Sequence, residues 1–99
     1  GLDQFRFAAA NVGVDRIADF VSGSDDIVVT AANFGLTAGA AARVVVNGAA
    51  TTASGTFLYN STTGALAFDA DGTGAGAAVQ FAILANKPAT LVAADFVLS

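Results

Sequence analysis

The strongest constraint on the fold is an alternation of large and small residues within residues 55–84. Leu66 and Phe68 alternate with alanines, and a second alternating run of the same kind ends this stretch. Such alternation places large apolar side chains on one face of a β-sheet and small ones on the other. The residues between the two runs are rich in glycine and contain an Asp-Gly pair, a favoured hairpin signal. The sequence therefore predicts two antiparallel strands joined by an acidic turn, with residues 56–60 pairing in front of them.

The same signals recur along the rest of the chain, where short apolar runs are separated by turn-forming residues. Further strands are expected at residues 2–8, 15–21, 26–29 and 43–46. Two similar segments that each end in phenylalanine, residues 30–34 and 91–96, predict single helical turns, whereas residues 36–42 fit either a loop or a helix. We expect one domain spanning residues 1–99, with an all-β fold. Its predicted form is a small sandwich or roll of short, mostly antiparallel strands with one or two helical turns.

The alternation also predicts which residues form the core and which form an outer face. The expected core contains Phe5, Phe7, Ile17, Phe20, Leu66, Phe68, Val79, Phe81 and Ile83. The expected outer face of the sheet is rich in small residues, namely Ala65, Ala67, Ala78 and Ala82. Small side chains let another sheet or chain approach closely, so this face is a candidate contact surface.

The composition excludes several classes of function. Histidine, cysteine and glutamate are absent, so catalytic triads and thiol chemistry are not available and we expect no enzymatic activity. The net charge is −4 and the four basic residues are scattered, which argues against nucleic-acid binding. Residues 44–68 carry no charge, but serine, threonine and asparagine interrupt them, so membrane insertion is not expected.

The acidic turn is the densest group of polar ligand atoms in the sequence. Asp69, Asp71 and Thr73 present oxygens at alternate positions, and the adjacent glycines let the main chain curl around them. Calcium prefers six to eight such oxygens, so these three residues are candidate calcium ligands. The alternative is a hairpin turn with solvated aspartates. Residues 72–77 also approach the dinucleotide motif G-x-G-x-x-A, but a strand rather than a helix is expected to follow, which argues against a nucleotide site.

Short motifs in a fixed order run along most of the chain. The first third carries D-x-F-x-F, D-x-I-x-D-F and D-x-I, the central region carries F-L-Y-N-x-x-T-G-x-L-x-F-D-A-D-G-x-G, and L-x-A-A-D-F follows near residue 95. This order resembles the C-terminal segment of the repeats-in-toxin (RTX) proteins, calcium-binding bacterial proteins that are exported by type I secretion. The calcium-binding nonapeptide of that family, G-G-x-G-x-D, does not occur in the chain.

The resemblance implies a non-catalytic domain of an extracellular or cell-surface bacterial protein. Such a domain caps a calcium-binding β-roll and is recognised by the type I secretion apparatus. The implied export signal comprises Asp95, Phe96, Val97, Leu98 and Ser99. The resemblance also gives Asp19 and Asp25 a role in closing the last calcium turn, while the alternative is that both are ordinary surface and turn residues.

A second hypothesis is a self-assembling extracellular subunit of a surface layer or a filament. Only 12% of the residues are charged, about half the share of an ordinary soluble domain. Low surface charge and a face of small residues both favour association between copies, so a homo-oligomer or filament is expected under this hypothesis.

Overall fold

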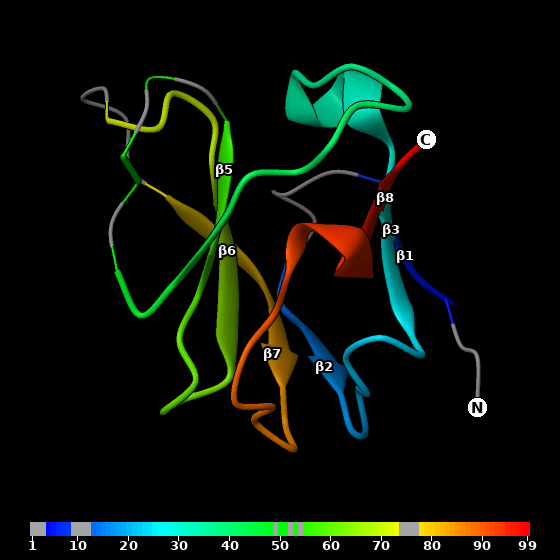
Figure 1. Cartoon of the computed structure of the whole chain (residues 1–99), viewed down its shortest axis with the longest axis vertical. Coiled ribbons are helices and arrows are strands. Elements are labelled where there is room, and N and C mark those ends of the chain that lie inside the picture. Colours follow the sequence, from blue (N-terminus) through cyan, green and yellow to red (C-terminus); the bar gives the residue numbers. More distant parts are fainter. Residues whose placement is uncertain (1–3, 9–12, 49, 52, 54, 74–77) are drawn as a thin grey trace.

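The computed structural model describes residues 4–8, 13–48, 50–51, 53, 55–73 and 78–99. These residues form eight strands and two short 3-10 helices (Figure 1). The strands are β1 (Gln4–Phe7), β2 (Asp15–Ile17), β3 (Asp26–Val29), β4 (Val44–Val46), β5 (Thr56–Tyr59), β6 (Ala65–Asp69), β7 (Val79–Leu84) and β8 (Phe96–Leu98). The helices are η1 (Ala31–Phe34) and η2 (Ala93–Asp95). The predicted all-β fold with one or two helical turns is confirmed.

The strands belong to two sheets, and most of their pairings are parallel. One sheet has three strands in the order β1-β3-β8, and the other has five in the order β2-β7-β6-β5-β4. Within the described residues only β5–β6 and β6–β7 are antiparallel, while the other four pairs are parallel. The central hairpin and its front strand are thus confirmed, but the prediction of mostly antiparallel strands is wrong. Turn signals reveal hairpins between neighbours, whereas parallel partners come from distant parts of the chain.

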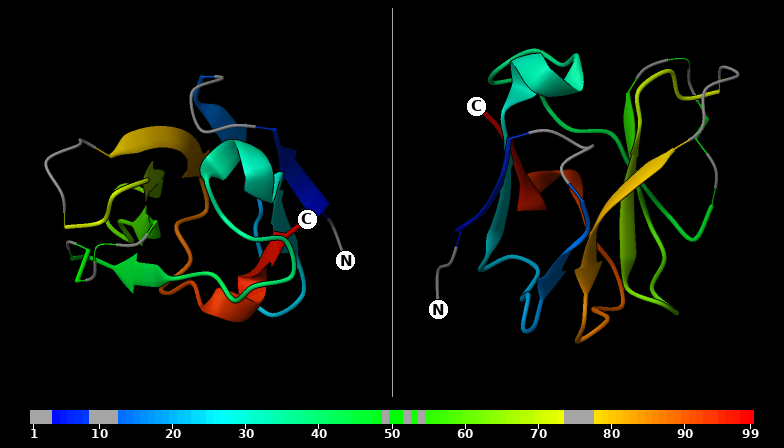
Figure 2. Two further views of the ribbon diagram at one scale, coloured as in Figure 1. Left: turned by 90° about the horizontal axis from the view of Figure 1, so that it is seen from above. Right: turned by 180° about the vertical axis from the view of Figure 1, so that it is seen from behind.

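The two sheets pack against each other across a single apolar core (Figure 2). Phe7 of the three-stranded sheet meets Phe81 of the five-stranded sheet with ring centroids 4.9 Å apart, and Phe57 stacks on Phe96 at 4.5 Å. These contacts join the first and last strands of the smaller sheet to the middle of the larger one. Six of the predicted core residues are buried, namely Phe7, Ile17, Phe20, Leu66, Phe68 and Phe81.

A β-bulge interrupts the pairing of β6 with β7. Leu66 lies opposite Ala82, but the next residue, Ala67, lies opposite Gln80, so Phe81 is an extra residue in β7. One extra residue reverses the side-chain alternation beyond it. As a result the consecutive residues Phe81 and Ala82 are both buried.

This bulge explains the errors in the predicted faces of β7. Ala82 points into the core rather than to the outer face, and Leu84 is buried in place of Ile83, which is only half-buried. Val79, at the start of the strand, is 43% exposed, so its prediction as a core residue is also wrong. Phe5 packs at the margin of the core and is half-buried.

The two helical turns deliver matching aromatic side chains to the core. Phe34 ends η1, and Gly35 stops that helix in the left-handed region with a φ of 69°, as its sequence predicts. Phe96 directly follows η2. Both rings contact Phe57, at centroid distances of 6.0 and 4.5 Å. Residues 36–42, for which the sequence allowed either a loop or a helix, form turns and irregular structure.

Candidate functional site

The acidic turn lies at the end of β6. Asp69 is the last residue of that strand and only 8% exposed, Asp71 is half-buried, and Thr73 is exposed. Gly72 adopts a φ of 57°, which turns the chain back over the aspartates. The structure therefore places Asp69 and Asp71 together, while Thr73 is exposed and is not shown to join them. The remainder of the glycine-rich turn, residues 74–77, lies outside the described residues.

The two carboxyl groups of this turn interact directly. The side chain of Asp71 lies within hydrogen-bond reach of Asp69 and, together with burial, raises the pKa of Asp69 above its ordinary value. The main-chain N–H groups of Asp71 and Gly72 oppose this shift in part. One oxygen, Oδ1 of Asp69, is buried and has no hydrogen-bond partner among the described residues. The site thus places two carboxyl groups around an oxygen that has no hydrogen-bond partner in the described part of the chain.

The second predicted acidic pair lies in a different turn, between β2 and β3. Asp19 is exposed, whereas Asp25 is buried and its Oδ2 accepts a hydrogen bond of 2.9 Å from the N–H of Val21. Asp25 therefore stabilises its own turn. No cluster of three potential metal-binding side chains occurs within the part of the chain that the structure describes. The calcium role of Asp19 and Asp25 therefore stays a prediction.

The predicted export signal is a folded part of the three-stranded sheet. Phe96 and Leu98 of β8 point into the core, while Val97 is 39% exposed and Ser99 is exposed. The N–H of Ser99 donates to the carbonyl of Val29, which extends the pairing of β8 with β3.

Asp95, the acidic residue of this segment, is a buried link between distant parts of the chain. It is 1% exposed and accepts hydrogen bonds from the Ser22 hydroxyl at 2.6 Å and the Gly23 N–H at 2.8 Å. The N–H of Val92 donates to the same carboxylate at 3.0 Å. Asp95 therefore holds η2 against the β2–β3 turn. No local sequence pattern indicates this role, because the main partners of Asp95 are more than 70 residues away.

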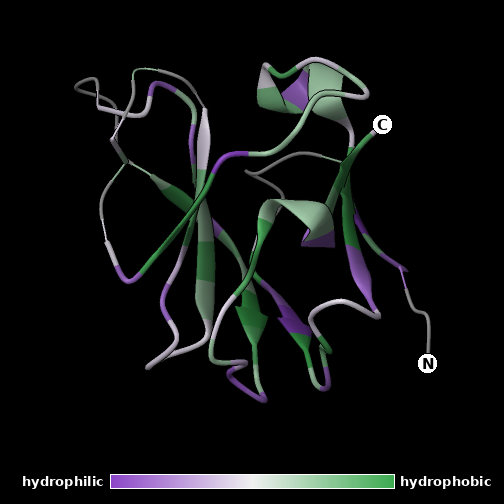
Figure 3. Cartoon of the chain, in the orientation of Figure 1, coloured by the Kyte–Doolittle hydropathy of each residue, from purple (hydrophilic) through white to green (hydrophobic). Residues whose placement is uncertain are grey.

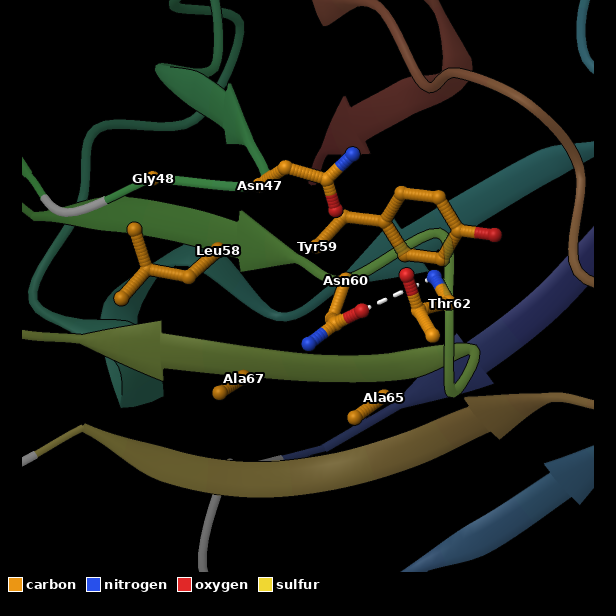
Figure 4. Close-up of a pocket in the computed structure, with 8 residues that line it drawn as sticks. All are labelled: Asn47, Gly48, Leu58, Tyr59, Asn60, Thr62, Ala65 and Ala67. Carbon is orange, nitrogen blue, oxygen red and sulfur yellow. Dashed lines mark hydrogen bonds between the residues drawn. The ribbon is translucent and has the colours of Figure 1, made fainter.

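A depression of about 560 Å³ lies on the outer face of the five-stranded sheet. Figure 4 shows Leu58 on β5, Ala65 and Ala67 on the neighbouring strand β6, and Asn47 and Asn60 near the ends of β4 and β5. The prediction of Ala65 and Ala67 on an outer face is thus confirmed, and their small size creates the hollow.

The polar groups around this depression are largely engaged with each other. Asn60 accepts from the N–H of Thr62 at 2.8 Å, and Asn47 exchanges two hydrogen bonds with Ser61. The hydroxyl of Tyr59 donates to the carbonyl of Pro88. Among the described residues that line the depression, none is charged. It therefore offers shape but few free polar groups for a ligand.

No protein-family model, curated protein or solved structure matches this chain. In the described part of the chain, no helix is both long and apolar enough to cross a membrane. A function for this chain therefore has to be inferred from its residues and their geometry.

Proposed function

We propose that the chain is a non-catalytic C-terminal domain of an RTX-like extracellular bacterial protein. In this role it caps a calcium-binding β-roll through β1 and carries a type I export signal at residues 95–99. The observation that supports capping most strongly is the all-parallel three-stranded sheet, which has β1 as an end strand. A parallel β-roll grows by adding parallel strands, so a domain that caps it needs an open parallel edge.

The hydrogen-bond pattern identifies the main-chain groups at this edge. The carbonyl of Phe7 accepts a hydrogen bond from the N–H of Thr30, so the main-chain groups of Phe7 point toward β3. Because successive residues of a parallel strand bond to opposite neighbours, the N–H and carbonyl of Arg6 face away from β3. The end strand of the other sheet has the same geometry. The carbonyl of Ile17 accepts a hydrogen bond from the N–H of Ala85, so the main-chain N–H and carbonyl of Arg16 in β2 face away from β7.

Proline substitution at these two arginines tests capping. Arg6→Pro removes the edge N–H of β1, whereas the control Arg16→Pro removes the equivalent group of β2. When the chain is fused after an array of calcium-binding nonapeptide repeats, we expect only Arg6→Pro to weaken the calcium-dependent folding of the array. Circular dichroism during a calcium titration measures this folding. The stability of each variant is also measured in the isolated domain, so that a general loss of folding can be subtracted. If the two substitutions then weaken the folding of the array equally, docking at β1 is contradicted.

The burial of β8 determines how an exporter reads the proposed signal. Phe96 and Leu98 are inside the native core, so their side chains are accessible only before the domain folds. Deleting residues 91–99 would remove both the signal and a core strand. A substitution that spares the core is therefore the sharper test.

We expect Val97→Asn to reduce export of a fused passenger severalfold, while the control Val79→Asn leaves export unchanged. Both valines lie in strands and are similarly exposed, at 39% and 43%, so the two substitutions perturb folding to a similar degree. Secreted and retained passenger are quantified in a bacterium that carries a type I exporter. Unchanged export after deletion of residues 91–99 would exclude the assignment of the signal to this segment.

A second candidate function, self-assembly, is favoured by the unequal protection of the sheet edges. The end strands β1 and β2 carry charged side chains, which discourage pairing with other chains, whereas β4 and β8 carry none. In Figure 3, β8 is green throughout, whereas β2 is largely purple. Ordered arrays or filaments of the isolated chain in electron micrographs would support assembly, and a monodisperse monomer in light scattering at high concentration would contradict it.

A further inference from the structure

The carboxylate of Asp69 is only partly satisfied by the described residues, because one of its two oxygens, Oδ1, receives no hydrogen bond from them. Asp69 lies opposite Thr56 in the β5–β6 ladder, which fixes its main chain. Its side chain is more than nine-tenths buried, and Oδ1 receives no hydrogen bond from the described residues. An unpaired buried carboxylate oxygen is strongly unfavourable, so its presence indicates a missing partner.

Asp71 determines the chemistry of that partner. Its carboxyl group lies within hydrogen-bond reach of Asp69 and is itself only half-buried. Two carboxylates this close repel each other unless a proton or a cation lies between them. A neutral or anionic ligand would not relieve this repulsion.

The geometry points to a divalent-cation site in which Asp69 and Asp71 bind one calcium ion, with Asp71 on the solvent side. The donors are carboxylate oxygens, and the chain contains no histidine or cysteine, so softer metals such as zinc and copper are disfavoured. The irregular turn at Gly72 suits the variable geometry of calcium better than the strict octahedron of magnesium. Water completes the coordination, because two carboxylates supply too few oxygens.

Two carboxylates and a partly open turn imply weak binding. The dissociation constant is expected to be about 10⁻⁴ to 10⁻³ M, the range of extracellular calcium modules. At about 10 mM calcium, a ligand of this affinity that binds only the folded state should raise the melting temperature by about 6–14 °C. This inference is independent of the proposed export and capping roles, since it concerns the isolated chain.

Melting curves of the chain and of three variants test the site. Calcium chloride is compared with magnesium chloride and with sodium chloride of equal ionic strength. We expect Asp69→Asn and Asp71→Asn to abolish the calcium-specific shift. Asp69→Asn should also raise the melting temperature without calcium, because it removes a like charge beside Asp71. The control Asp26→Asn, at a half-buried aspartate in β3 of the other sheet, should keep the full response.

Nuclear magnetic resonance of the unmodified chain provides a second readout that needs no variant. Calcium should shift the amide signals of residues 69–73 and leave those of the β2–β3 turn unchanged. If these signals and the melting temperature do not respond to calcium, the carboxyl pair holds a shared proton and the cation site is excluded. A calcium response that persists in both Asp69→Asn and Asp71→Asn would equally overturn the inference.

Discussion

Replacing Phe57 with alanine is expected to lower the free energy of unfolding by about 3–5 kcal/mol, the range for large aromatic truncations in a core. Phe57 is completely buried and contacts four other phenylalanine rings. These rings are Phe34, Phe68, Phe81 and Phe96. They come from η1, β6, β7 and β8, so one truncation opens a cavity at the point where both sheets and a helical turn meet. Since domains of this size are stable by about 5–15 kcal/mol, the variant should be near the limit of folding.

Urea denaturation monitored by circular dichroism measures this change. Phe5→Ala is the matched control, because Phe5 is half-buried at the edge strand β1 and makes a single ring contact, to Phe20 at 6.2 Å, in the described structure. We expect the control to lose clearly less stability than Phe57→Ala. Equal losses for the two variants would show that Phe57 is not the centre of the core.

Asp95→Ala is expected to destabilise the domain by about 3 kcal/mol, although Asp95 belongs to the segment predicted as an export signal. The substitution leaves the main-chain N–H groups of Gly23 and Val92 and the Ser22 hydroxyl without the acceptor that they have in the native fold. A fully buried orphaned donor costs about 1–3 kcal/mol, and because these three donors are partly accessible, water recovers much of the summed cost.

The control for this prediction is Asp19→Ala in the neighbouring turn. Asp19 is exposed, so its removal should change the free energy of unfolding by no more than about 0.5 kcal/mol. Denaturation of both variants in the same buffer gives the comparison. A loss of stability in Asp95→Ala as small as in the control would contradict the structural role of Asp95.

The parts of the fold that could be predicted are those with local physical causes. Alternation and turn residues identified the β5–β6–β7 hairpins, and the matching segments that end in Phe34 and Phe96 identified both helical turns. The parallel pairing of β3 with β1 and β8 could not be predicted, because it joins segments without a shared turn. The bulge at Phe81 was also hidden, since an extra residue looks like regular alternation in the sequence.

The candidate site likewise has some features that a local sequence pattern predicts and others that depend on distant parts of the chain. The spacing of Asp69 and Asp71 in a glycine-rich turn was sufficient to propose them as ligands. Their unequal burial and the unpaired Oδ1 of Asp69 depend on how the β5–β6 ladder ends, which no local pattern records. The roles of Asp25 and Asp95 in fixing turns were missed because a buried aspartate and a surface aspartate look alike in a sequence.

The position of β3 between β1 and β8 has a consequence for biosynthesis. The ribosome makes β1 and β3 early, but β3 lacks its second neighbour until residues 96–98 have been translated and have left the exit tunnel. Phe96 is also needed to complete the ring cluster on Phe57. Because the pairing spans most of the chain, it forms slowly even then. Vectorial synthesis therefore delivers the nascent domain as an incomplete sheet, while any globular domain translated ahead of it has time to fold first.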